Sequence, residues 1–337
     1  MLGRKSGVAT HLRQMYPDLM VWHCLNHRLE LAVGDTVKHV NNVNHFTSFL
    51  DKIYTLYHRS PKNCRKLAQH AQELEVNVQK IGRVLDVRWA ASSFRTIKTV
   101  WSSYTALHQH FRAAAMDGTR EDNEKAMYSG PMTKMETQEF LCDLGLMYDT
   151  LEEIAHLSLN LQERGMTLTK ADKLMRRTIL IISSMITSPG DKKQDALAAA
   201  ERKEFHGIPL TANPRLRQID SAVFLQSLTE NLEDRLFSTG SSRHPGVSAE
   251  NTAQYTDLLH HFNVLNPENW PVPLHEQYGE ACIKELAHRF RLDPRKVLEG
   301  FRDYKEDSSV IPQNLSPVTS ILSLIPVSNA ECERGFS

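Results

Sequence analysis

Apolar side chains recur at helical spacing along most of the chain, and this pattern constrains the fold more than any other feature of the sequence. Residues three or four apart in an α-helix share one face, so an apolar stripe at this spacing predicts a helix that packs into a core. The main predicted helices lie around Leu29–Tyr57, Ser93–Ala113, Leu141–Glu163 and Leu174–Ile186. A shorter stripe covers residues 8–15. We therefore expect a mainly helical protein.

One short apolar run does not fit the helical pattern. Leu19–Cys24 opens with four consecutive apolar residues and is the one segment that we predict as a buried strand. A single strand cannot form a sheet, because a sheet needs neighbouring strands that supply backbone partners. Either Leu19–Cys24 is not a strand, or the rest of its sheet lies outside this chain.

Breaks and caps divide the predicted helices. Stretches rich in Pro, Gly, Ser or charge predict breaks at residues 116–133, 187–217, 238–250 and 303–314. Ser60-Pro61 has the pattern of a cap followed by the first residue of a new helix. Near the end of the chain, Ser316-Pro317 opens a short helix and Pro326 closes it.

Composition excludes several classes of protein. The 337 residues suit one large domain or two ordinary ones. Forty Lys and Arg balance forty Asp and Glu, so any contact with DNA needs a local basic patch. No apolar run reaches the roughly 18 residues of a membrane span, and we expect no membrane partner. The five scattered cysteines favour a reducing compartment, the nucleus or the cytoplasm.

Cys24 and His27 form a Cys-x-x-His pair at the end of the predicted strand. A structural zinc ion needs four ligands in a tetrahedral array, and no matching second pair lies nearby. We therefore favour a structural motif at the turn from strand to helix, and we expect no metal.

Arg88 and Trp89 precede a strongly amphipathic segment that Ser92 or Ser93 could cap. A tryptophan in this place is either a core anchor, because it buries a large apolar area, or a platform on which a base stacks. The nearby cations Arg95 and Lys98 fit a DNA contact and a solvated helix face equally well.

The last ten residues carry two glutamates with different predicted roles. Ser328 and Glu331 have the spacing of a capping box, so Glu331 reaches back to its own helix start. Glu333 lies two residues further on, about 200° around the helix, and is available for chemistry.

Three stretches together resemble the hAT superfamily of transposases and their domesticated vertebrate descendants. The sequence Ser-Asn-Ala-Glu-Cys-Glu-Arg-Gly-Phe-Ser at 328–337 is similar to the carboxy-terminal signature of the family. The sequence His-Cys-Leu-Asn-His-Arg-Leu-Glu-Leu at 23–31 resembles its Cys-x-x-His-x-Leu-x-Leu element, and Arg88-Trp89 resembles its Arg-Trp element. The three elements follow one another in the family's order.

The resemblance implies an RNase H-like α/β core interrupted by a large all-helical insertion. Residues 1–40 would be a partial core with one retained strand, 41–315 the insertion, and 316–337 a truncated dimerisation region that returns to the core. In the active family three acidic residues hold two Mg²⁺ ions for strand transfer, a mechanism in which both metals clamp the reacting oxygens. The third acid corresponds to Glu333, whereas the first two would lie upstream of Met1. Arg88 and Trp89 correspond to contacts with the transposon end.

We therefore expect a domesticated or truncated hAT transposase-like protein that is not an enzyme as given and holds no cofactor. Self-association through the carboxy-terminal region is implied, with DNA as a further partner. Two alternatives stay open. The chain could be an inert helical scaffold for protein interactions, or a fragment of a longer hAT-derived regulator of the zinc-finger or SUMO-ligase type.

Overall fold

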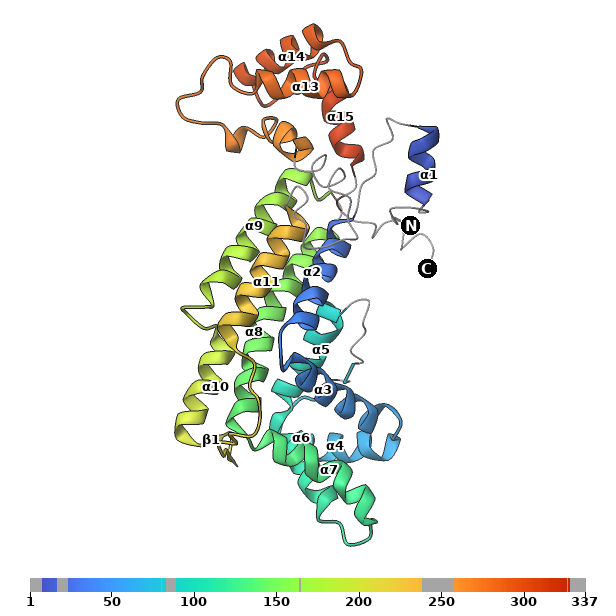
Figure 1. Cartoon of the computed structure of the whole chain (residues 1–337), viewed down its shortest axis with the longest axis vertical. Coiled ribbons are helices and arrows are strands. Elements are labelled where there is room, and N and C mark those ends of the chain that lie inside the picture. The colour runs from blue at the N-terminus through green and yellow to red at the C-terminus, as the bar shows by residue number, and fades with distance from the viewer. Residues whose placement is uncertain are drawn as a thin grey trace. The chain divides into compact units, whose positions relative to one another are not determined.

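The computed structural model describes residues 8–16, 24–79, 81–82, 89–163, 165–237, 257–325 and 327. These ranges hold fourteen α-helices and a single two-stranded antiparallel hairpin, which confirms the mainly helical fold (Figure 1). No helix in the described ranges is long and apolar enough to cross a membrane. Of the predicted strand Leu19–Cys24 only Cys24 is described, in irregular structure before the first long helix. The RNase H-like core therefore stays a prediction.

The elements and their bounds are α1 Val8–Met15, α2 Leu25–His39, α3 Val43–His58, α4 Pro61–Glu73, α5 Trp89–Ser102, α6 Tyr104–Ala115, α7 Asp122–Met135, α8 Gln138–Leu161, α9 Leu168–Ser184, α10 Asp191–Arg202, β1 Glu204–Phe205, β2 Ile208–Pro209, α11 Ser221–Leu236, the 3-10 helix η2 Pro267–Asn269, α13 Glu280–Arg289, α14 Pro294–Glu306 and α15 Ser316–Leu324. Residues 257–263 are also helical.

The chain divides into two compact units. Unit 1 comprises Met1–Leu29, Leu159–Arg177 and Leu232–Ser337, and unit 2 comprises Glu30–Ser158 and Thr178–Asn231. The predicted domain boundaries at residues 40 and 315 follow from the resemblance to hAT transposases and stay a prediction.

The predicted helices are present, although two of them are divided. The stripe over Leu29–Tyr57 becomes α2 and α3, which are separated where Asn42 adopts a left-handed conformation with φ 72°. The stripe over Ser93–Ala113 becomes α5 and α6, which are separated at Ser103. Apolar periodicity continues through both breaks because the two helices of each pair still face the core.

Three details of the sequence-based prediction are wrong. The predicted break at 116–133 contains most of α7, in which Pro131 lies inside the helix and removes only one backbone donor. The predicted break at 187–217 contains α10, whose alanines and charged residues are good helix formers. Neither Ser92 nor Ser93 caps α5, because that helix already begins at Trp89.

Helix α8 is the centre of unit 2. Every residue from Phe140 to Leu151 is buried, so this helix has no solvent-facing side over three turns. Two aspartates fall within the buried stretch, and each accepts hydrogen bonds from the backbone of another segment. Asp143 accepts from the amide of Ile219 at 3.1 and 3.3 Å. Asp149 accepts from the first-turn amides of α10 at 3.0 and 2.8 Å and thereby caps that helix.

A glycine allows α10 to approach α8 closely. A Cβ atom at Gly145 would lie 2.5 Å from the backbone oxygen of Lys192 and 2.9 Å from the Cα of Lys193. Backbone atoms cannot turn aside as a flexible side chain can, so a larger residue at position 145 would push the two helices apart.

In unit 1, α13 and α14 lie side by side (Figure 1). Apolar side chains fill the contact, among them Ile283 and Phe301, both fully buried. Glu280 on α13 joins Arg302 on α14 through two hydrogen bonds of 2.7 and 3.0 Å. This bidentate ion pair fixes the register of the helical hairpin.

Two glycine substitutions test the close approach of α8 and α10. Gly145→Ala is expected to lower the free energy of unfolding by about 1–3 kcal/mol, because the added methyl group overlaps backbone. Gly34→Ala on α2 is the matched control, since nothing lies within 4 Å of a Cβ there. It should raise the free energy of unfolding by about 0.5–1 kcal/mol. Urea unfolding measures both, and an equal effect of the two substitutions would contradict the packing.

Candidate nucleic-acid interface

The residues predicted from the sequence to bind DNA or metal fall mostly outside the described ranges. Arg88 and Glu333 are not described, and of Trp89 only the backbone is described, as the first residue of α5. Whether Trp89 is a core anchor or a stacking platform, and the separate roles of Glu331 and Glu333, therefore stay predictions. Arg95 and Lys98 are exposed on α5, as a solvated helix face or a DNA contact would require.

Cys24 and His27 lie at the start of α2 but are differently placed. Cys24 is buried just before the helix, and His27 is exposed in the first turn. The amide of Leu25 donates to the carbonyl of Val327 at 3.2 Å, which ties this turn to the carboxy-terminal segment within unit 1. Among the described residues no group of three His, Cys, Asp or Glu could hold a metal ion.

Basic residues gather in unit 2 at the corner between α3 and α4, a feature that was not predicted from the sequence. Residues 52–72 contain five Lys or Arg and no Asp or Glu. Overall neutrality hides this segregation, and a local charge count along the chain reveals it. We call the exposed cations Lys52, Arg59, Lys62 and Arg65 the α3–α4 corner.

These four side chains differ from the fifth cation of the stretch. Lys66 pairs with Asp117, with 3.9 Å between the ammonium and the carboxylate. Within the described ranges none of the four cations of the α3–α4 corner has an acidic side chain within ion-pair distance. Their positive charge is therefore available to an anion from solution.

The local sequence explains why the chain turns at this point. Ser60 adopts an extended conformation and its hydroxyl accepts from the amide of Asn63 at 3.2 Å, which caps α4. Pro61 occupies the first helical position, where its missing N–H costs nothing. The prediction of a cap and first residue at Ser60-Pro61 is thus confirmed.

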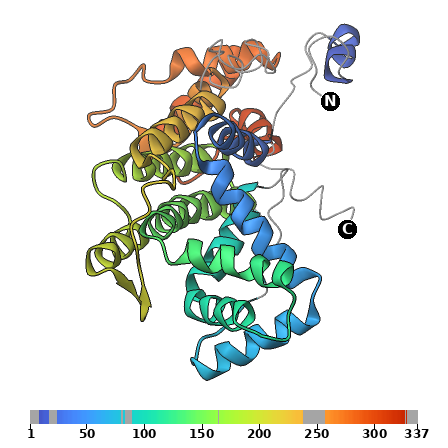
Figure 2. The same ribbon diagram turned by 60° about the horizontal axis from the view of Figure 1, so that its bottom comes forward.

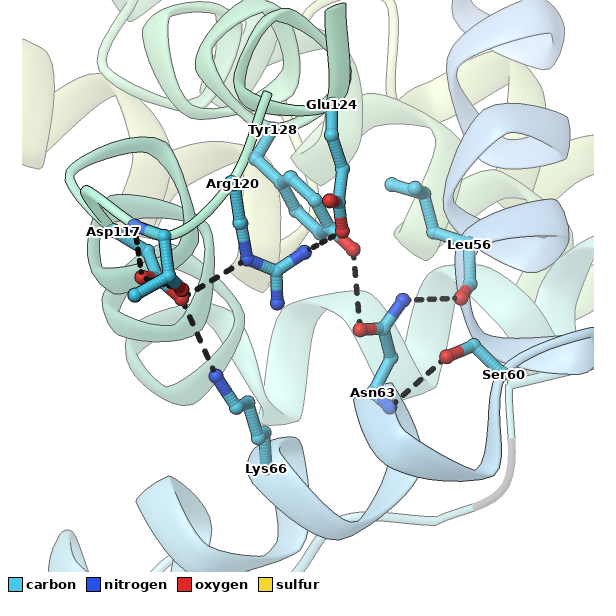
Figure 3. Close-up of polar contacts among 9 residues, drawn as sticks. Leu56, Ser60, Asn63, Lys66, Asp117, Arg120, Glu124 and Tyr128 are labelled. Carbon is cyan, nitrogen blue, oxygen red and sulfur yellow. Dashed lines mark hydrogen bonds and ion pairs between the residues drawn. The ribbon is translucent and has the colours of Figure 1, made fainter. Parts of the chain in front are cut away.

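Asn63 locks the turn to the core (Figure 3). Its side-chain amide donates to the carbonyl of Leu56 at 2.8 Å, at the end of α3 where no further helical donor follows. Its side-chain oxygen accepts from the hydroxyl of Tyr128 on α7 at 3.1 Å. One buried amide thereby joins α3, α4 and α7, so the cations of the corner project from a rigid base.

The loop between α6 and α7 supports the same base from the other side. Figure 3 shows Arg120 between Asp117 and Glu124, with its guanidinium 4.8 Å from the centroid of the Tyr128 ring. Hydrogen bonds from the hydroxyl and amide of Thr119 lower the pKa of Asp117 to about 2. Asp117 is therefore ionised at neutral pH and holds both Lys66 and Arg120. Figure 2 shows the resulting cluster of α4 in light blue with α6 and α7 in teal and green.

The position of the cations opposes the stability of α4. A helix N-terminus carries a partial positive charge, so acidic residues normally favour the first turn and cations do not. The first turn of α4 contains no acid and includes Lys62. The arrangement disfavours the isolated helix and favours a bound anion.

A buried histidine lies behind the corner. The hydroxyl oxygen of Tyr57 is 2.6 Å from Nδ1 of His110, and the His70 ring centroid is 6.0 Å from that of His110. Burial, followed by the nearby charges of His70, Lys66 and Arg120, lowers the pKa of His110 to about 4. His110 is therefore neutral at physiological pH.

Beside the corner a groove of about 720 Å³ runs between α3 and α7. Its apolar lining includes Phe49, Leu56, Met127 and Pro131, with Lys52 on its edge. Met127 keeps 55% of its surface exposed, so the groove is open to a partner.

No protein-family model matches the chain, and no solved structure matches it. The relation to hAT transposases therefore depends on the three sequence elements described above.

Removal of the Asn63 side chain tests the base of the corner. Asn63→Ala should lower the free energy of unfolding by about 1–3 kcal/mol, because the Leu56 carbonyl and the Tyr128 hydroxyl lose a buried partner. Gln69→Ala is the control, since Gln69 is exposed on the same helix and should change the free energy by less than about 0.5 kcal/mol. Urea unfolding measures the free energy of unfolding of both variants. Equal losses for Asn63→Ala and Gln69→Ala would show that the Asn63 side chain does not stabilise the turn.

The free energy of unfolding should also depend on pH through two buried groups of opposite sign. The pKa of His110 falls from 6.5 to about 4, so between these values the unfolded chain holds the extra proton. Stability is therefore lost as the pH drops through this window, by at most about 3 kcal/mol.

Burial raises the pKa of Asp143 from 3.8 to about 7, so the folded chain holds the extra proton and stability is lost as the pH rises.

Single variants separate the two titrations. The wild-type profile minus that of Asp143→Asn gives the aspartate effect, in which stability falls from pH 4 to 7. The wild-type profile minus that of His110→Gln gives the histidine effect, in which stability falls from pH 6.5 to 4, because Asp149, whose pKa burial also raises, is common to all three chains. Urea unfolding at several pH values measures the profiles. Two flat difference profiles would mean that neither group has a shifted pKa.

Proposed function

We propose that the chain is a hAT-transposase-derived helical module that associates with DNA and contacts the phosphate backbone through the α3–α4 corner. The observation that carries the proposal is the acid-free stretch 52–72 on a rigid turn, in a protein without net charge. Phosphate contacts come mainly from Lys and Arg and need no sequence-specific groups. Arg88 and Trp89 are proposed as further contacts, and self-association through the carboxy-terminal region as a second property.

Three features support DNA over other anionic partners. The three sequence elements resemble a family that acts on DNA. The exposed cations come from two consecutive helices, so they can follow more than one phosphate. The cation in the first turn of α4 opposes the helix dipole, which indicates a role other than stability.

The test is binding of a labelled random-sequence duplex across a range of salt concentrations. The variant Arg59→Gln/Lys62→Gln/Arg65→Gln should bind more weakly, and the slope of log affinity against log salt should fall in magnitude by about 2 to 3. Loss of three phosphate contacts accounts for that change, since each contributes roughly 0.9 to the slope.

A variant of equal charge provides the control. Lys173, Arg176 and Lys192 each pair with an acidic side chain, and Lys173→Gln/Arg176→Gln/Lys192→Gln lowers the net charge by the same amount. This control should keep the wild-type slope. If both variants lose the same slope, net charge alone explains the binding and the corner has no special part.

A protein-interaction scaffold is the second candidate, and the groove between α3 and α7 favours it. Met127→Ala would remove an apolar side chain from the groove without adding a charge beside Lys52, and it should leave duplex binding unchanged if the corner acts alone. A wild-type chain that shows no salt-dependent duplex binding would leave the scaffold as the better account.

A further inference from the structure

The turn between α13 and α14 in unit 1 has the same construction as the α3–α4 corner. Its sequence at 288–296 is His-Arg-Phe-Arg-Leu-Asp-Pro-Arg-Lys, with four Arg or Lys and one acid. The four cations are exposed and are Arg289, Arg291, Arg295 and Lys296, which we call the α13–α14 turn.

The one acid of the stretch is already engaged. The carboxylate of Asp293 accepts from the amides of Arg295 and Lys296 at 3.0 and 3.4 Å and caps α14. In the described ranges Arg289, Arg295 and Lys296 have no acidic side chain at ion-pair distance. As in α4, proline follows the cap, and the first turn holds cations and no acid.

The turn is held in one conformation by backbone contacts. The amide of Leu292 donates to the carbonyl of Ala287 at 2.8 Å, and that of Arg291 to the carbonyl of His288 at 3.2 Å. This pattern closes α13 with Arg291 at φ 55°, a position that glycine favours. The Phe290 ring stacks on Phe262 with centroids 6.2 Å apart. The backbone that carries the cations is therefore held in one conformation on a packed hairpin.

The chemistry of the turn fits nucleic-acid phosphate better than a membrane surface. Three of the four cations are arginines, whose planar guanidinium can hold two phosphate oxygens at once. Membrane-surface helices add exposed apolar side chains that enter the lipid. No large apolar side chain between residues 276 and 309 is exposed.

We propose that the α13–α14 turn is a second nucleic-acid contact, which binds duplex phosphate separately from the α3–α4 corner. The inference rests on the proposed association with DNA but not on the corner itself, because the two cation groups belong to different units. An electroneutral chain that gathers exposed cations at two turns, each followed by a capped helix, carries two sites for the same polyanion.

The experiment uses the full chain and the variant Arg289→Gln/Arg295→Gln/Lys296→Gln. The salt slope for duplex binding should fall in magnitude by about 2 to 3, and by about 5 when this variant is combined with the α3–α4 triple variant. The thermal midpoint should change little, since Arg295 and Lys296 leave the start of α14, where a cation is unfavourable, and Arg289 leaves the last turn of α13, where a cation is favourable. The Lys173, Arg176 and Lys192 triple variant again controls for net charge.

The outcomes separate the two proposals. If the α3–α4 variant lowers the slope and the α13–α14 variant does not, the inference is overturned while the proposed function stands. If the α13–α14 variant alone lowers the slope, the second contact stands and the corner is not used. A wild-type chain whose duplex affinity does not depend on salt would overturn both the proposed function and the inference. A variant that binds duplex normally but loses binding to phosphatidylserine vesicles would assign the turn to a membrane and overturn the inference.

Discussion

The complete burial of α8 from Phe140 to Leu151 is the constraint on which unit 2 depends. A helix without a solvent-facing side must supply partners for each polar group that it carries, because an unpaired buried carboxylate is costly. Asp143 and Asp149 meet this demand with backbone amides from Ile219 and from the start of α10. These two contacts hold the segment between residues 190 and 219 against α8, although that segment contains only short elements. Gly145 completes the arrangement by allowing backbone to approach backbone.

Charged side chains, unlike the buried polar groups of α8, are not matched one by one with partners. Forty cations and forty anions could pair evenly over the surface. Instead, cations gather at two turns that are each followed by a capped, proline-started helix. The cations in the first turns of these helices, Lys62, Arg295 and Lys296, oppose the helix dipole by about 0.3–1 kcal/mol each. Polar contacts offset this cost: the buried Asn63 secures one turn, and the partly exposed pair Glu280–Arg302 joins the two helices of the other.

Local patterns in the sequence predict the helices and the Ser60-Pro61 start well, because each depends on residues within a few positions. Contacts between distant segments are not predictable in this way. The role of Asn63 requires Tyr128, 65 positions further on, and the cap of α10 belongs to α8. Pro131 suggested a break, yet α7 continues through it. The hairpin of two-residue strands is too short for any alternation to appear. The basic corner is predictable from a local charge count, but the net charge of the whole chain conceals it.

The cap on α10 also makes the stability of this helix depend on α8. This helix has twelve residues, near the length of about 12–15 below which an isolated helix is marginal in water. Its first-turn amides find their acceptor only on Asp149, in a helix more than forty positions earlier. The stability of α10 therefore depends on its contact with α8. The amide hydrogens of Lys192 and Lys193 then exchange with solvent only when the contact with α8 opens, whereas the other end of α10 frays independently.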